Sequence, residues 1–158
     1  MNSPQPARSP GLLLIKALTC MMFFTFAMTT DAVGSIIPTL LAEFELSLRA
    51  ASAFHYAPMI AIAVGALGLG FLADRVGRKR TIVIGLALYG LSSLLFAFGT
   101  GFGFFVVLLA AGGIGISVFK IGALALIGDV SRSTREHTTF MNTVEGFFAV
   151  GAIVGPAI

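Results

Sequence analysis

The 158-residue chain carries far less charge than a soluble domain. Hydrophobic residues make up 57% of it and charged residues 11%, with a mean hydropathy of +0.99 and a formal net charge of +3. Soluble domains are about 25% charged, and so few acids and bases cannot cover a globule of this size. The composition therefore excludes an ordinary soluble domain and predicts that the apolar runs face lipid or one another.

Five apolar runs follow a short polar start. Residues 1–11 contain three prolines and no hydrophobic periodicity, which predicts a disordered cytoplasmic tail. The first run is too long for the apolar part of a signal peptide, so we interpret it as a retained span. The predicted spans are residues 12–42, 50–73, 81–98, 102–128 and 140–158. The sequence thus predicts an all-α integral membrane bundle over residues 12–158, with the chain ending inside its fifth span.

The distribution of bases predicts the orientation of these spans. Eight of the ten bases fall on one side, where cytoplasmic loops carry an excess of Lys and Arg. Only Arg49 falls on the other side, and Lys120 lies within a span. We therefore expect a multi-pass protein of the plasma or inner membrane with a cytoplasmic N-terminus. The eight bases are Arg8, Lys16, Arg75, Arg78, Lys79, Arg80, Arg132 and Arg135.

A dense motif, GFLADRVGRKR, fills the break between the second and third spans. It resembles, almost position for position, the signature loop of the major facilitator superfamily, G-x-L-A-D-R-x-G-R-K/R. The resemblance implies a conformational lock, in which the loop holds the two halves of a transporter in the outward-open state through the Asp and a neighbouring Arg. The alternative is a basic loop that serves only membrane topology, although such a loop does not need Gly and Asp here. The lock residues are Gly70, Asp74, Arg75, Gly77, Arg78, Lys79 and Arg80.

Each part of this motif also has a physical interpretation. Gly70 permits another helix to approach closely, and Gly77 permits a tight turn. Asp74 lies at a predicted helix end, where it can accept from backbone N–H groups or basic side chains. The cluster Arg78 to Arg80 is suited to anionic lipid head groups.

A second resemblance lies in the fifth span. Asn142 precedes a Phe-Phe pair and a G-x-x-x-G-P element, and this combination is similar to the fucose and hexose symporter branch of the superfamily. Gly151 and Gly155 share a helix face, and Pro156 adds a bend. In the fourth span, Gly113 and Gly115 are predicted to serve helix packing rather than nucleotide binding, because no strand precedes them.

The chain also departs from the family pattern at the fourth span. The family often carries an Arg four residues before the first of the span's paired glycines, whereas this chain has Leu109. The family's acid followed by Arg at seven residues is matched only in part, because Asp129 is followed by Arg135 at six. The proton-relay role of the missing Arg cannot be transferred to this chain.

Three ionisable side chains fall inside predicted spans, where charge is costly and each is a functional candidate. Asp31 is a candidate proton or substrate ligand; the alternative is a solvated acid near the outer surface, if Pro38 ends the helix early. Lys120 and Glu145 lie at similar heights on consecutive spans, so a salt bridge between them is geometrically possible. That pair is either structural or opened by a proton or solute. Asn142 is the fourth candidate in this group.

The resemblance implies secondary active, proton-linked symport or antiport of a small solute, either a sugar or an organic anion. The expected partners are protons, the lipid bilayer and a missing C-terminal half, with no nucleic acid. We expect no enzyme activity, metal or cofactor, because no residue pattern suggests hydrolysis, metal binding or nucleotide binding. The main alternative is a truncated or regulatory membrane protein that keeps the packing motif, and a channel is a weaker third.

Overall fold

The structure is a computed structural model that describes residues 10–43, 47–99 and 101–157. Most of the expected tail lies outside these residues. The described residues are helical with no strand, which confirms the all-α class. The helices are α1 (Pro10–Glu43), α2 (Leu48–Leu69), α3 (Leu72–Arg75), α4 (Arg78–Leu95), η1 (Phe96–Phe98), α5 (Phe102–Val130), α6 (Thr134–Val154) and η2 (Gly155–Ala157).

Five helices in the described part of the chain are long and apolar enough to cross a membrane. They correspond in order to the five predicted spans, although the ends differ. The second span ends at Leu69 rather than at residue 73, and a short helix, α3, follows it. The fifth helix begins at Thr134, six residues before the predicted start.

The early start of α6 has a local cause. Ser133 is the N-cap, and its Oγ accepts a hydrogen bond of 3.2 Å from the backbone N–H of Glu136. The Glu136 carboxylate in turn accepts from the backbone N–H of Arg132 at 2.9 Å. This exchange is a variant of the capping box, which satisfies backbone donors at a helix start. The signal was present in the sequence as Ser133-x-x-Glu136, but hydrophobicity alone did not reveal it.

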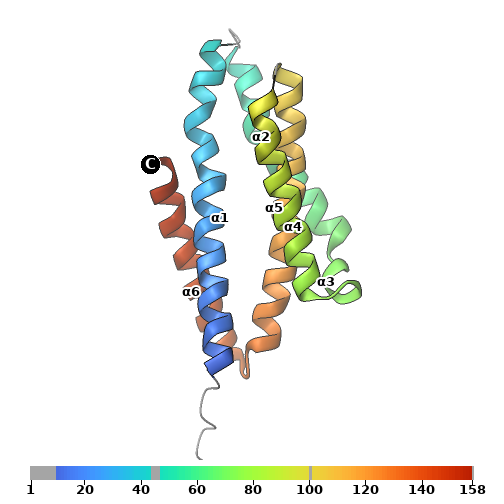
Figure 1. Ribbon diagram of the computed structural model, residues 1–158, viewed down its shortest axis with the longest axis vertical. Helices are drawn as coiled ribbons and strands as arrows, with labels where there is room; N and C mark the ends of the chain where they lie inside the picture. The colour runs from blue at the N-terminus through green and yellow to red at the C-terminus, as the bar shows by residue number, and fades with distance from the viewer. Residues whose placement is uncertain (1–9, 44–46, 100, 158) are drawn as a thin grey trace, which may run out of the picture. The chain divides into compact units, whose positions relative to one another are not determined.

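The chain divides into two compact units. The first, called here the α1/α6 unit, comprises Met1–Ser35 and Val130–Ile158, and the second, the α2/α4/α5 unit, comprises Ile36–Asp129. Figure 1 shows the helices of both units, coloured along the chain. Helix α1 continues through Pro38 to Glu43, so this proline does not end the helix.

Glycines bring the helices of the α2/α4/α5 unit together. A Cβ atom built on Gly113 would lie 2.6 Å from the carbonyl oxygen of Pro58, so α5 lies directly against α2 there. On Gly115 it would lie 2.7 Å from the backbone nitrogen of Tyr89, which brings α5 against α4. Small residues allow this close approach of backbones in membrane helices. The centre of α5 is accordingly well buried, with Phe119 fully inaccessible.

The α1/α6 unit uses the same device. A Cβ on Gly151 would collide with the carbonyl oxygen of Phe24, and one on Gly155 with that of Met28. The two glycines are four residues apart, so Gly151 in α6 and Gly155 at its C-cap form one small-residue face against α1. Pro156 follows in the 3-10 turn η2, after the α-helix has ended.

Candidate functional site: the Arg78 bridge

The signature loop is shaped by a glycine between two helices. Gly77 separates α3 from α4 and has φ 94° and ψ 150°, the one positive φ among the described glycines. An L-side chain is strained in this backbone conformation, whereas glycine adopts it freely. The turn places Arg78 at the first position of α4, four residues after Asp74.

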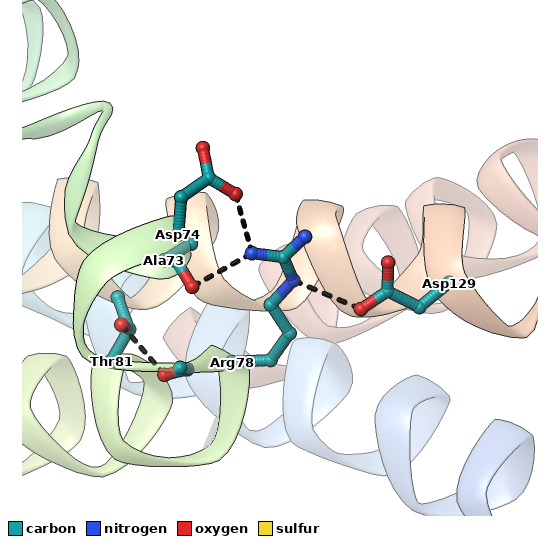
Figure 2. A network of polar contacts seen from close by, with 6 residues as sticks. Ala73, Asp74, Arg78, Thr81 and Asp129 are labelled. Atoms are coloured by element: carbon teal, nitrogen blue, oxygen red, sulfur yellow. Dashed lines mark hydrogen bonds and ion pairs between the residues drawn. The ribbon is translucent and has the colours of Figure 1, made fainter.

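Arg78 connects three helices through one guanidinium group (Figure 2). Its Nη1 donates to Oδ1 of Asp74 at 2.6 Å and to the carbonyl oxygen of Ala73 at 2.7 Å. Its Nε donates to Oδ2 of Asp129, near the end of α5, at 2.9 Å. The planar fork of arginine suits it to bond groups in different directions at once. We call this set of contacts the Arg78 bridge.

The three charged side chains of the Arg78 bridge are all partly exposed. The Arg78 side chain is 30% exposed, and the side chains of Asp74 and Asp129 are 75% and 52% exposed. Ion pairs as exposed as these contribute little to stability in water. The bridge is therefore better suited to setting the relative positions of α3, α4 and α5 than to holding the bundle together.

The other motif residues have different roles. Arg75 does not join the bridge; its guanidinium lies 4.9 Å from the centre of the Phe71 ring. Lys79 and Arg80 are exposed. A Cβ on Gly70 would lie 3.3 Å from the carbonyl oxygen of Ala66, in the turn just before it, and no other helix among the described residues lies within 4 Å of that position.

Asp129 is the bridge residue that sequence reasoning did not assign. The sequence drew attention to Asp129 only because Arg135 follows it six residues later, which suggests a partner later in the chain. Its partner, Arg78, instead lies 51 residues earlier. The useful signal would have been that both residues fall at helix ends on the same predicted side of the membrane.

The proton and solute candidates occupy two units. Asp31, Asn142 and Glu145 belong to the α1/α6 unit and are exposed, and Thr30 Oγ1 donates to Oδ2 of Asp31 at 3.3 Å. Lys120 lies half-buried in α5, in the other unit, so its pairing with Glu145 stays a prediction. Helix α1 continues beyond Asp31 to Glu43. Within the described ranges, no three His, Cys, Asp or Glu side chains gather to hold a metal ion.

A second ion pair, missed by the sequence analysis, joins α1 to α6. Lys16 Nζ donates to Oε1 of Glu136 at 2.5 Å, and the two side chains are 19% and 27% exposed. The Lys16 ammonium also lies 5.1 Å from the centre of the Phe140 ring. Glu136 thus caps α6 and binds α1 with the same carboxylate.

We expect Lys16→Gln and Glu136→Gln to be coupled in a double-mutant cycle. Each single change should lower the melting temperature in detergent slightly, and the double variant should be less destabilised than the sum, because both changes break the same contact. Raising the salt concentration should shrink the coupling, since the pair retains access to solvent. Strictly additive effects would contradict the contact.

Comparison with known proteins gives the context for this geometry. Residues 19–158 match the family described as Major Facilitator Superfamily. The chain is 31% identical over 145 residues to the quinolone resistance protein NorA of Staphylococcus aureus, covering 87% of this chain and 36% of NorA. It is also 31% identical over 121 residues to the 4-hydroxybenzoate transporter PcaK of Pseudomonas aeruginosa, covering 77% of this chain and 27% of PcaK.

The chain spans 36% of the length of NorA and 27% of the length of PcaK. The family match nevertheless covers nearly all the described helices and the whole Arg78 bridge. This multi-pass membrane chain belongs to the Major Facilitator Superfamily.

Proposed function

We propose that this chain supplies one half of a secondary active transporter for a small organic solute, driven by a proton gradient. The observation that carries the proposal is the Arg78 bridge, which links the superfamily's signature loop to the end of α5. A contact between helix ends that contributes little stability is suited to break and re-form in an alternating-access cycle. We place the protein in the cell's inner or plasma membrane, with a cytoplasmic N-terminus.

The relatives favour an organic anion over a sugar as the solute. PcaK is named as a transporter of 4-hydroxybenzoate, an aromatic carboxylate, and NorA as a quinolone resistance protein. Neither name supports the fucose and hexose branch suggested by the fifth span. We therefore propose an aromatic or similar organic acid as the solute class, without choosing between symport and antiport.

The test is solute movement in proteoliposomes that contain the whole transporter. We expect radiolabelled 4-hydroxybenzoate to move uphill when a pH gradient is imposed, and to stop when a protonophore dissipates the gradient. The 158-residue chain by itself should not accumulate solute, because substrate sites in this superfamily lie between two bundles. The alternative, a regulatory membrane protein that keeps the loop, predicts no movement of this or any screened solute under any gradient.

Asp31 is the candidate for proton coupling. Asp31→Asn removes the titratable group from α1 but keeps its size, so we expect uphill transport to be lost while solute exchange at equal pH continues. Asp31→Glu keeps a carboxylate and should retain part of the coupling. Counterflow and pH-driven uptake, measured on the same liposomes, separate the two activities. Unchanged pH-driven uptake by Asp31→Asn would remove Asp31 from the mechanism.

A further inference from the structure

A groove of about 950 Å³ lies within the α1/α6 unit. Its walls are the first turns of α1 on one side and the beginning of α6 on the other. On α1 it extends from Leu12 to Met21, which is about 14 Å by helical rise and close to the half-thickness, about 15 Å, of a bilayer's hydrocarbon core. The groove is thus about as long as one leaflet is deep.

The two ends of the groove differ in chemistry. At the start of α6 it is lined by Arg132, Ser133 and Arg135, and beside them by the Lys16–Glu136 pair. Lys16, Arg132 and Arg135 are three bases against one acid, Glu136, so positive charge is left in excess at this end of the groove. In the described part of the chain, neither guanidinium has an acidic side chain within ion-pair distance.

The other end of the groove is apolar. Farther along the helices its lining includes Met21, Phe140 and Phe147, of which Met21 and Phe147 are exposed. An apolar trough with cations at one end is complementary to an amphiphile with an anionic head group. A small hydrophilic anion would leave the apolar part of the groove unused.

We propose that this groove binds an anionic phospholipid, with its phosphate against Arg132 and Arg135 and an acyl chain along Met21 and Phe147. Both arginines are exposed and lie in the loop and first turn of α6, so their side chains can reach a head group at the membrane surface. The proposal does not rest on transport. It requires only that the chain is inserted in a bilayer.

The experiment is native mass spectrometry of the 158-residue chain, released from micelles that contain equal amounts of phosphatidylglycerol and phosphatidylcholine with identical acyl chains. We expect phosphatidylglycerol to be retained several-fold more than phosphatidylcholine. Arg132→Gln/Arg135→Gln should abolish this preference, and Arg132→Lys/Arg135→Lys should keep most of it. The backbone bond from Arg132 to Glu136 does not depend on these side chains, so we expect the helix cap to survive.

Two further variants separate the groove from general charge. Arg49→Gln removes a positive charge near the start of α2, at a residue that does not line the groove, so it should leave the preference unchanged. Ala17→Trp fills the groove from α1 without altering charge, and it should reduce retention of phosphatidylglycerol. Circular dichroism checks that each variant remains helical.

Four outcomes would overturn the proposal. The first is equal retention of the two lipids by the unaltered chain, and the second is an unchanged preference in the double glutamine variant. The third is complete displacement of phosphatidylglycerol by millimolar inorganic phosphate, which would show a simple anion site rather than a lipid groove. Unaltered retention by Ala17→Trp would likewise place the lipid outside the groove.

Discussion

Replacing Arg78 with glutamine is expected to slow solute uptake by the whole transporter roughly tenfold, a typical size for a lost conformational coupling. The change removes the donors that reach Asp74, Ala73 and Asp129, so α3, α4 and α5 lose their common contact. Arg78→Lys should rescue only part of the rate, because an ammonium lacks the planar fork that bonds in two directions. Initial uptake rates in proteoliposomes measure both effects.

A double-mutant cycle shows whether the Arg78 bridge itself is responsible. Asp129→Asn should slow uptake in the same direction, and adding Arg78→Gln to it should cause little further loss, because both break one contact. Lys79→Gln removes one positive charge at the adjacent residue but breaks no contact with Asp74 or Asp129, so it should slow uptake less than Arg78→Gln does. The melting temperature should change little in all of these variants, since the bridge is exposed. If the fold-losses in uptake rate of the two single variants multiply in the double variant, Arg78 and Asp129 act separately.

Replacing Gly85 with alanine is expected to lower the free energy of unfolding by about 1–3 kcal/mol, the usual cost of overpacking. A methyl group at this position in α4 would collide with the backbone nitrogen of Phe119 and lie 2.8 Å from the carbonyl oxygen of Gly115. These are backbone atoms of α5, which cannot rotate aside as a side chain can. The two helices must move apart, with loss of the packing that buries the middle of α5.

Gly90 provides a matched control on the same helix. A Cβ atom there has no atom within 4 Å, so Gly90→Ala should change the free energy of unfolding by at most about 1 kcal/mol. A small stabilisation is the more natural direction, because alanine is the better helix former. Reversible unfolding of the 158-residue chain in mixed micelles of a denaturing and a mild detergent measures both variants. Equal effects at the two positions would contradict the close contact of α4 with α5.

The four glycines assigned to helix packing show what can and cannot be predicted from their spacing in the sequence. Their spacing predicts that Gly113, Gly115, Gly151 and Gly155 lie on helix faces where backbones approach. The structure adds the partner of each: Pro58 in α2 for Gly113, Tyr89 in α4 for Gly115, and α1 for the other two. The spacing of glycines along one helix predicts which face of that helix is used for packing. Which helix packs against that face depends on how the bundle is assembled.

The membrane class, the five apolar helices and the signature loop can be predicted from the sequence, because hydropathy and turn chemistry act over a few neighbouring residues. The ion pairs Arg78–Asp129 and Lys16–Glu136 cannot be predicted in this way, because their partners are 51 and 120 residues apart and meet only in the folded chain. The residues next to a charged side chain at a helix end do not indicate which distant side chain it will pair with. The pairing follows from which helices pack side by side, and that is settled by close contacts such as those of Gly85 and Gly151.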